Sequence, residues 1–405
     1  MTIVVLGDLG RSPRMQYHAQ ALAAHDIDVD VVAHAGTRPP AALLDHPRIA
    51  LHLLPQHRER ARSRATFVPA AALATLGQAL RLLWLLFFTV PKPDVLLVQS
   101  PPAIPTLLVA RVVARLRAAR LVVDWHNLAW TLLALRLGQH HSVVRAARVY
   151  ERALGRRADG HLCVSKAMQA ALQRDWGLRD VRVLYDRPAE RFAPVPPAAR
   201  PAVLARLLGD AGGVARRAAV IVSPTSWTVD EDYDLLLDAA DRCETALGER
   251  GAVELLVVLT GRGALRERYE ARFAARRARR VRLRTLWLED EDYPLLLGAA
   301  DLGLCLHRSA SGLDLPMKIA DMLGAGLPVC ALDYGPCLAE QIRDGDNGLR
   351  FTDAAGLASL LAELFSRFPE TPRLDRLRES VATARGLSWR AGWEVEAREA
   401  VIGRG

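Results

Sequence analysis

The sequence predicts an α/β protein made of two doubly wound domains that face one another across a cleft. Short apolar runs typical of buried parallel strands alternate with longer helical stretches, and the alternation restarts after a proline-rich segment at 186–200. A length of 405 residues also suits two or three domains rather than one. In such sheets, ligands bind at the carboxyl ends of the strands.

The apolar runs give the expected strands in order. In the first half they are 3–6, 29–33, 95–99, 121–124 and 160–164, and in the second half they are 219–223, 255–260, 281–286, 302–306 and 328–332. We therefore expect an N-terminal domain at 1–190, a linker at 191–217 and a C-terminal domain at 218–385.

Composition narrows the class of partner. The formal net charge of +9 and the pI of about 9.7 indicate an affinity for something anionic, which includes nucleic acid, acidic lipid headgroups and phosphorylated substrates. The five cysteines occur singly and form no metal-binding pattern, so we interpret them as small buried side chains in a reducing compartment. The chain opens on a strand and a turn, so we expect no signal peptide.

The segment 67–90 is apolar over 24 residues and contains one charge, Arg81. Its densest part, 82–90, is too short to span a bilayer. One alternative is a buried or groove-lining helix, and the other is a helix in the membrane interface with Trp84, Phe87 and Phe88 in contact with lipid. Arginines on both sides favour the second alternative: Arg58, Arg60, Arg62 and Arg64 upstream, and Arg111, Arg115, Arg117 and Arg120 downstream.

Two groups of candidate residues follow strands of the first half. The turn GDLGRSPRMQYHA contains Asp8, and Ser12 and Pro13 are suited to the start of a helix. We expect its Gly10, Arg11 and Arg14 to face a diphosphate or the acceptor. After the strand at 121–124, His126 can accept a proton or bind a sugar hydroxyl, with Asn127 beside it. The alternative is a histidine with only local structural hydrogen bonds.

Lys318 and Asp321 are the most informative pair. Lysine occurs only at positions 92, 166 and 318, against 51 arginines, so a lysine before a helix indicates a need for a compact ammonium group. Lys318 and Asp321 lie three residues apart, so on a helix they share one face. There Lys318 would bind a phosphate and Asp321 would accept hydrogen bonds from ribose hydroxyls. The alternative is a surface ion pair between the two.

Further candidates follow strands of the second half. Hydroxyl and backbone N–H groups after the strand at 219–223 would wrap a diphosphate, and the next strand ends would contact a base. These donor-site candidates are Ser223, Thr225, Ser226, Gly261, Arg262, Gly263, Trp287 and Leu315. On the diphosphate and acceptor side we expect His307, Ser311 and Gly312.

Five strings, taken together, resemble the chitobiosyldiphosphodolichol β-mannosyltransferase family: GDLGRSPRMQYHA, DWHN, VLYDRPAERF, SPTSWTVDEDYDLLLDA and HRSASGLDLPMKIADMLGAGLPVCALDYG. The resemblance implies a glycosyltransferase-B fold of two Rossmann-like domains, in which 1–190 would face the acceptor and the membrane and 218–385 would bind the nucleotide sugar. It also implies GDP-mannose as donor, a lipid-linked saccharide as acceptor, inversion at the anomeric carbon and no bound metal or other cofactor. The closing stretch 386–405, with Trp389 and Trp393, resembles the helix that returns to the N-terminal domain.

Retaining enzymes of this fold have two glutamates in the donor site, and Leu313 and Asp321 stand at these positions here. The missing first glutamate favours inversion, in which one base takes the acceptor proton while positive groups, here Lys318 and Arg14, stabilise the departing diphosphate. His126 and Asp8 are the candidate bases, and His126 is favoured because its neutral form is available at pH 7.

The arginine bias indicates a GC-rich, prokaryotic genome, in which the lipid need not be dolichol and the enzyme would work at the cytoplasmic face of the plasma membrane. Alternatives are a transferase that uses another nucleotide sugar on a polyprenyl-diphosphate acceptor, and a sugar-nucleotide epimerase. A basic nucleic-acid-binding protein would explain the charge, but the sequence lacks interleaved aromatic and basic residues, so we expect no nucleic-acid partner.

Overall fold

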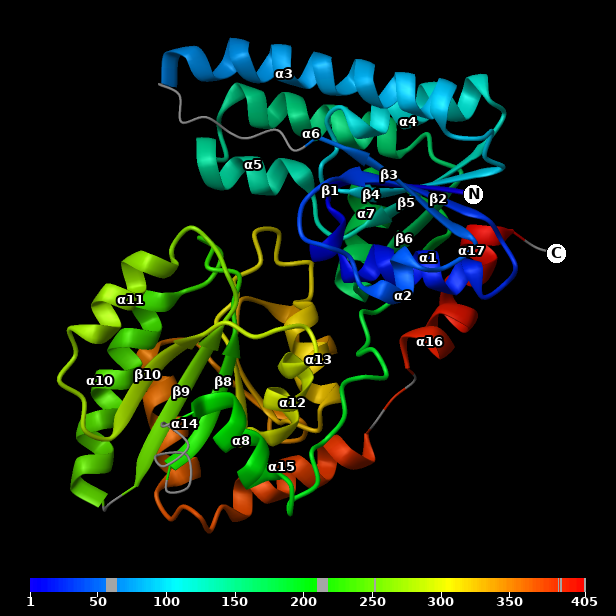
Figure 1. Ribbon diagram of the computed structural model, residues 1–405. Helices are drawn as coiled ribbons and strands as arrows, with labels where there is room; N and C mark the ends of the chain where they lie inside the picture. Colours follow the sequence, from blue (N-terminus) through cyan, green and yellow to red (C-terminus); the bar gives the residue numbers. More distant parts are fainter. Residues whose placement is uncertain (56–63, 210–217, 251–252, 385, 387, 404–405) are drawn as a thin grey trace. The chain divides into compact units, whose positions relative to one another are not determined.

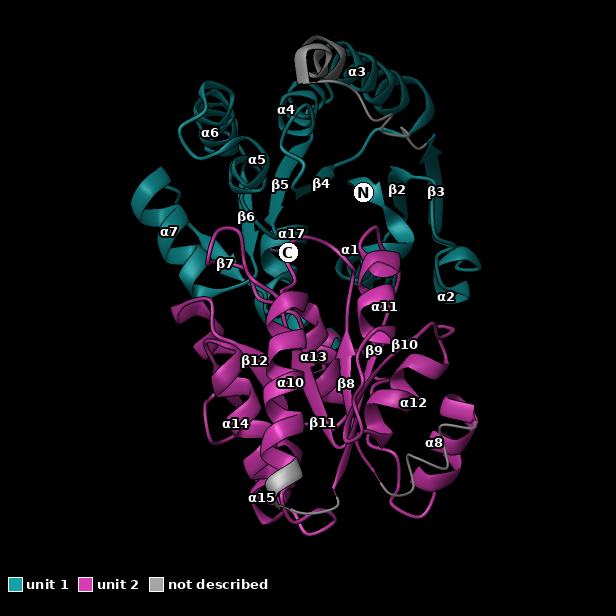
Figure 2. Cartoon of the chain, turned by 90° about the vertical axis from the view of Figure 1, so that its left-hand side faces the viewer, with its two compact units in different colours: residues 1–185, 390–405 teal, residues 186–389 magenta. Residues whose placement is uncertain are grey.

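The computed structural model describes residues 1–55, 64–209, 218–250, 253–384, 386 and 388–403 (Figure 1). They form two compact units, coloured separately in Figure 2: Met1–Tyr185 with Arg390–Gly405 make unit 1, and Asp186–Trp389 make unit 2. Each unit contains one parallel sheet between layers of helices. The predicted fold class of two Rossmann-like, doubly wound domains is confirmed.

The sheet of unit 1 has the order β3-β2-β1-β4-β5-β6-β7. Its strands are β1 Thr2–Asp8, β2 Val29–His34, β3 Ile49–Leu54, β4 Val95–Ser100, β5 Arg120–Trp125, β6 Gly160–Cys163 and β7 Val181–Val183. The order reverses direction between β1 and β4, and ligands bind at the carboxyl ends of strands beside such a switch point.

The helices of unit 1 include two that come from the C-terminal end of the chain. They are α1 Pro13–Ala23, α2 Ala41–Leu44, α3 Arg64–Trp84 continued by η2 Leu85–Thr89, α4 Thr106–Leu116, α5 Ala129–Leu137, α6 Ser142–Gly155, α7 Lys166–Trp176, α16 Trp389–Glu396 and α17 Arg398–Ile402. Pro13 occupies the first turn of α1 as predicted, but the Ser12 hydroxyl donates to the Asp8 carbonyl at 2.9 Å instead of capping the helix.

The sheet of unit 2 repeats the same winding, in the order β10-β9-β8-β11-β12-β13. Its strands are β8 Ala218–Pro224, β9 Glu254–Thr260, β10 Val281–Leu286, β11 Leu302–Cys305, β12 Val329–Leu332 and β13 Gly348–Phe351. Its helices are α8 Arg200–Leu208, α10 Tyr233–Arg250, α11 Arg266–Ala274, α12 Asp292–Ala299, α13 Met317–Gly324, η4 Pro336–Glu340, α14 Ala354–Phe365 and α15 Pro372–Thr383. The switch point lies between β8 and β11.

Two apolar layers fix the unit 2 sheet. Helices α10, α11, α14 and α15 contribute side chains such as Phe273 and Phe365 to one layer, and α8, α12 and α13 contribute side chains such as Leu208 and Met322 to the other. Each fully buried side chain of this kind stabilises the fold by roughly 1.5 to 3 kcal/mol. The strand ends, and the loops that follow them, are therefore held in defined positions.

The structure differs from the sequence analysis in two places. Strands β3, β7 and β13 were not predicted, because β3 is partly exposed and the other two have only three and four residues. The expected linker 191–217 contains α8, whose Leu204 and Leu208 are buried in the unit 2 core. Its last part, 210–217, lies outside the described residues.

Candidate functional site

The loops after β8 and β11 are hydrogen-bonded to each other at the switch point of unit 2. Asp232 N donates to Leu306 O at 3.1 Å, and Arg308 N donates to Asp230 O at 2.7 Å. Between these two bonds, Glu231 and His307 form an isolated β-bridge. The side chains of Glu231 and His307 are thus fixed at the edge of the sheet where doubly wound proteins bind ligands.

Glu231 organises this edge. Its side chain is 2% exposed and accepts a hydrogen bond from Ser226 N at 2.9 Å and one from the Tyr233 hydroxyl at 2.5 Å. The same carboxylate forms an ion pair with Lys318, in the first turn of α13. Glu231 therefore holds the Lys318 ammonium over the loop after β8, and sequence reasoning missed it because it lies within an acidic run that resembles a solvated helix start.

Asp321 lies on α13 but has other neighbours than Lys318. Tyr293 donates a hydrogen bond to its carboxyl group, and burial raises the pKa of Asp321 to about 8. The alternative of a surface ion pair between Lys318 and Asp321 is therefore wrong, because Lys318 is paired with Glu231. A carboxyl group with this pKa is mostly protonated at pH 7 and can both donate to and accept from a ligand hydroxyl, and its contact with a ribose stays a prediction.

His307 lies between two carboxylates. Its Nδ1 is 3.1 Å from Asp230 Oδ2, and its Nε2 is 3.4 Å from Asp314 Oδ2. Burial alone would lower the pKa of His307, but hydrogen bonds and charge from both carboxylates raise it to about 9. His307 is thus a cation at neutral pH, on the same edge as Lys318.

The turn between His307 and α13 is held by its own side chains. The Asp314 carboxylate accepts hydrogen bonds from Ser309 and, at 3.2 Å, from Ser311, and Gly312 N donates to Ser309 Oγ at 2.8 Å. Ser311 and Gly312, expected to contact a diphosphate or the acceptor, instead use these groups to build the turn. Leu315 is 7% exposed, and its place in the donor site stays a prediction.

Glycines allow the loops after β8 and β9 to touch. A Cβ atom on Gly261 would lie 1.9 Å from the Thr225 carbonyl oxygen, and one on Gly263 would lie 2.0 Å from that of Ser226. The Thr225 hydroxyl donates to Thr260 O at 2.6 Å, so it fastens the two loops together. The loops that carry five of the predicted donor residues are therefore in contact.

Arg262 and Trp287 form an exposed stacked pair beyond these loops. The guanidinium carbon of Arg262 is 3.5 Å from the centre of the Trp287 ring, and Trp287 is 41% exposed. A planar pair of this kind offers a stacking surface for a nucleotide base. Ser223, by contrast, is fully buried, and its hydroxyl has no hydrogen-bond partner among the described residues.

A buried ion pair lies at the end of β5 in unit 1. Arg14 Nε and Nη2 donate to the two carboxylate oxygens of Asp124, each at 2.8 Å, and Nη1 donates to Leu184 O at 2.7 Å. Burial alone would raise the pKa of Asp124, but Arg14 and the neighbouring histidines hold it well below its usual range. Arg14 is 1% exposed, so the expectation that it faces a diphosphate is wrong.

His126 is held by the same carboxylate. Its Nε2 is 2.9 Å from Asp124 Oδ2, and its side chain is 22% exposed. Because Asp124 is ionised, Nε2 presents an N–H, and Nδ1 keeps a lone pair that can accept a proton. A histidine oriented by a buried carboxylate is the arrangement of a general base.

Asp8, the second candidate base, is occupied by its own loop. Its carboxylate accepts hydrogen bonds from Gly10 N at 3.0 Å, and from Thr37 N and Oγ1, each at 2.9 Å. A Cβ atom on Gly10 would lie 2.3 Å from Thr37 O, so Gly10 serves the same contact between the loops after β1 and β2. Arg11, next in the chain, is exposed.

A buried glutamate fixes the loop that follows His126. Glu151 accepts hydrogen bonds from Ala129 N at 2.9 Å and Trp130 N at 3.2 Å, the first N–H groups of α5. Asn127 accepts from Leu128 N at 2.7 Å, so its amide oxygen also serves this turn. Burial raises the pKa of Glu151 to about 7. Sequence reasoning missed Glu151, which looks like a surface residue of an arginine-rich helix.

Helix α3 and η2 present apolar side chains outward. Those at least half exposed recur every three or four residues: Leu73, Leu76, Leu80, Trp84 and Phe88. Leu82 and Leu86 are fully buried, and Phe87 is half-buried. Helix α3 lies along α4 (Figure 1), so the segment is neither a wholly buried helix nor an exposed one. Among the described residues, no helix is both long and apolar enough to cross a bilayer.

The arginines beside this segment differ in role. Arg117 donates to the Leu86 and Val90 carbonyl oxygens, the latter at 2.9 Å, and so closes the end of η2 instead of facing outward. Arg115 is exposed on α4. Arg58, Arg60 and Arg62 lie outside the described residues.

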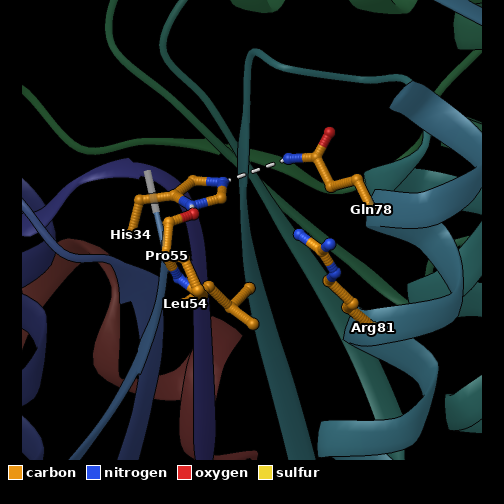
Figure 3. A pocket seen from close by; sticks show the side chains of 5 residues that line it. All are labelled: His34, Leu54, Pro55, Gln78 and Arg81. Atoms are coloured by element: carbon orange, nitrogen blue, oxygen red, sulfur yellow. Dashed lines mark hydrogen bonds between the residues drawn. The ribbon is translucent and has the colours of Figure 1, made fainter. Parts of the chain in front are cut away.

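A small pocket lies between α3 and the ends of β2 and β3. It is lined by His34, Leu54, Pro55, Gln78 and Arg81, and in Figure 3 Gln78 and Arg81 extend from α3 toward His34. Gln78 Nε2 and His34 Nε2 are 3.1 Å apart. Its cavity volume is about 20 Å³, far below the roughly 300 to 1,000 Å³ of pockets that enclose drug-sized ligands.

Comparison with known proteins identifies relatives over both units. Residues 10–188 match the family described as glycosyl transferase 4-like domain, and residues 217–367 match glycosyl transferases group 1. The chain is 42% identical to the UDP-glycosyltransferase TURAN of Arabidopsis thaliana, with 91% of this chain and 89% of that protein covered. It is 38% identical to the chitobiosyldiphosphodolichol beta-mannosyltransferase of Homo sapiens, with 96% and 90% covered.

Solved structures share the fold. Anabaena Alr3699/HepE in complex with UDP and glucose has a TM-score of 0.65 at 18% identity, with 98% of both chains covered. WaaG, a glycosyltransferase involved in lipopolysaccharide biosynthesis, has a TM-score of 0.65 at 15% identity, with 100% of both chains covered.

Replacing Glu151 by Gln should reduce the loss of stability as pH rises. Burial raises the pKa of Glu151 from 4.5 to about 7, so its contribution to stability is present below pH 4.5 and is lost as pH rises through 7. Urea unfolding of both proteins at pH 5, 6, 7 and 8 measures this. We expect the wild type to lose on the order of 2 to 3 kcal/mol more than the variant between pH 5 and 8. Parallel curves would contradict a buried, protonated Glu151.

Proposed function

Because the chain belongs to the glycosyltransferase family whose members are named chitobiosyldiphosphodolichol beta-mannosyltransferases, we propose that it transfers mannose from GDP-mannose to a lipid-diphosphate-linked saccharide with inversion. The chain is a glycosyltransferase; the donor, the acceptor and the stereochemistry are the proposal. The acceptor would be a polyprenyl or dolichyl diphosphate that carries an N-acetylglucosamine-type sugar. The observation that supports this best is the partly exposed ammonium of Lys318 at the carboxyl edge of the unit 2 sheet.

This edge suits a departing nucleoside diphosphate. The Lys318 side chain is 23% exposed beside Glu231, so its ammonium can still reach a ligand, whereas the charge of His307 is taken up by its two carboxylate partners. When the bond to the anomeric carbon breaks, negative charge develops on the diphosphate, and fixed positive groups stabilise it there. A charge-assisted hydrogen bond from an ammonium group to a phosphate is about twice as strong as a neutral one.

The base of the proposed reaction is His126. An acceptor hydroxyl that attacks the anomeric carbon must lose a proton, and the unprotonated Nδ1 of His126 can take it. Asp8 is the weaker candidate because its oxygens already accept three hydrogen bonds from its own loop and from Thr37. Leu313 stands where a retaining enzyme of this fold has its first glutamate, and an apolar side chain there supports inversion.

The donor nucleotide has a second candidate. The relative at 42% identity is named a UDP-glycosyltransferase, which favours a UDP-sugar. The stacked pair of Arg262 and Trp287 offers a surface that either base can use. Binding of the two nucleotides must therefore be compared directly.

We further propose that transfer needs no metal ion. In many nucleotide-sugar enzymes a divalent cation would neutralise the diphosphate, and here the Lys318 ammonium offers positive charge at the proposed position. We also propose that the enzyme works at the cytoplasmic face of a membrane. The five cysteines, all buried and free, suit a reducing compartment.

Lys318→Ala should weaken GDP binding at least about tenfold, because a charge-assisted contact contributes roughly 1.5 to 3 kcal/mol. Calorimetry with GDP and with UDP measures this, and the wild type should bind GDP more tightly. Lys92→Ala, at an exposed lysine of unit 1, is the matched control. Lys318→Ala alone leaves the buried Glu231 carboxylate unpaired. The double variant Lys318→Gln with Glu231→Gln removes both charges, so GDP affinity is measured for it as well. Unchanged GDP affinity in a folded Lys318→Ala protein would refute the contact, and tighter UDP binding would favour the second donor.

The product should be a β-mannoside, formed equally well in excess EDTA. Inversion of the α-linked donor gives the β-linkage. Activity should survive EDTA because Lys318, and not a metal ion, is proposed to bind the diphosphate. Digestion of the labelled product with α- and β-mannosidase decides the linkage. A product cut only by α-mannosidase contradicts inversion, and activity lost in EDTA and restored by Mg²⁺ or Mn²⁺ contradicts metal independence.

Vesicle binding should require anionic lipid and the outward apolar face of α3 and η2. A lipid-linked acceptor leaves the bilayer only at a cost of about 0.8 kcal/mol for each exposed CH₂, so the enzyme must approach the membrane. Residues 64–150 contain ten Lys or Arg and two acidic residues, Asp94 and Asp124, and Asp124 is buried against Arg14. This imbalance favours attraction to anionic headgroups.

Replacing Leu80, Trp84 and Phe88 together by Ser should reduce co-sedimentation with phosphatidylglycerol vesicles at least about tenfold, and high salt should weaken wild-type binding. Val229→Ser, at an exposed apolar residue of unit 2, is the control. The triple variant should bind GDP as tightly as the wild type does, because the proposed donor site belongs to unit 2. Equal vesicle binding by the triple variant would show that this face does not contact lipid.

A further inference from the structure

We infer that Trp393, in the C-terminal helix α16, positions the proposed base His126 through His18 and Asp124. The indole N–H of Trp393 fixes which nitrogen of His18 carries its proton, and His18 then shares the Asp124 carboxylate with His126. This inference rests on the proposed role of His126 in the transfer reaction. Trp393 and His18 would be positioning residues, because neither faces the substrate.

Three donors converge on one oxygen of Asp124. Oδ2 lies 2.8 Å from Arg14 Nε, 3.1 Å from His18 Nε2 and 2.9 Å from His126 Nε2. Arg14, His18 and Asp124 are at most 1% exposed. In a site with so little water, each nitrogen must present an N–H to the carboxylate, because a lone pair facing it would be strongly repelled.

Trp393 decides the tautomer of His18. Its Nε1 lies 3.0 Å from His18 Nδ1, and an indole nitrogen can only donate. His18 Nδ1 must therefore be the acceptor, and the proton of the neutral ring must sit on Nε2, where it points at Asp124. In the other tautomer, two N–H groups would face each other and a lone pair would face a carboxylate. Trp393 is fully buried, so water does not replace this bond.

The consequence reaches His126. With His18 fixed as a donor and Arg14 bound to both oxygens, the carboxylate of Asp124 cannot rotate. Asp124 Oδ2 also accepts a hydrogen bond from Nε2–H of His126, and this leaves Nδ1 of His126 as the proton acceptor. Without the indole N–H, His18 is free to change tautomer or to take up a second proton, and either change weakens the hold on His126.

The titratable groups around this network come from three elements. Helix α1 contributes Arg14 and His18, and the end of β5 contributes Asp124 and His126. The ring of His25, which follows α1, is tilted against that of Trp393, with 5.6 Å between the ring centres, and His25 is paired with Glu394 of α16. A pH profile therefore reports on these groups together.

Trp393→Phe tests the inference, because it keeps an aromatic ring and removes the N–H. We expect kcat to fall about tenfold, which is part of the roughly 10²- to 10⁴-fold that a positioned general base contributes, with unchanged KM for the donor and unchanged GDP affinity. The acid limb of the kcat–pH profile should also shift. Val395→Ala, at an exposed residue of α16, should behave as wild type. A wild-type kcat and pH profile in Trp393→Phe would overturn the inference.

Nitrogen NMR of protein labelled with ¹⁵N-histidine provides a readout that does not depend on turnover. Wild-type His18 should be neutral with its proton on Nε2 between pH 6 and 8, and Trp393→Phe should show a mixture of tautomers or partial protonation. A wild-type His18 protonated on Nδ1 would overturn the inference even if the variant is inactive. If the wild type transfers no sugar but His18 shows the expected tautomer, then the proposed function fails while the network stands.

Discussion

The buried ion pair between Arg14 and Asp124 is the interaction on which the unit 1 site depends. Removing two charges from water costs several kcal/mol for each ion, and the bidentate geometry together with further donors offsets this cost. The pair joins α1 to β5, and through His18 it reaches Trp393 near the end of the chain. Loss of one partner would leave an unpaired buried charge, at roughly 3 to 5 kcal/mol.

Unit 2 uses a buried carboxylate in a similar way. Glu231 follows β8 at the switch point and binds a backbone N–H, a tyrosine hydroxyl and the ammonium of Lys318. In each unit a carboxylate at the carboxyl edge of the sheet orients one partly exposed functional side chain, His126 in unit 1 and Lys318 in unit 2. Such preorganisation is what catalysis by positioning and charge stabilisation requires.

The sequence alone was sufficient for the main strands, because buried parallel strands are continuous apolar runs with clear boundaries. It also located His126 at a strand end. It could not show that Arg14 is buried, because its partner Asp124 lies 110 residues away. The pairing of Lys318 with Glu231 spans 87 residues and was missed for the same reason. The periodicity of apolar residues along a short segment predicts a strand or a helix. It cannot predict these contacts, because they depend on how distant loops meet at the edge of a sheet.

The proposed transfer is tested most directly by a comparison of donors. The protein is incubated with a synthetic polyprenyl diphosphate that carries chitobiose, and with radiolabelled GDP-mannose, UDP-glucose or UDP-N-acetylglucosamine in separate reactions. If Lys318 binds the diphosphate of GDP-mannose, label should enter the lipid fraction from GDP-mannose much faster than from either UDP-sugar. Label that enters from a UDP-sugar, with none from GDP-mannose, would contradict the proposed donor while leaving the glycosyltransferase fold in place.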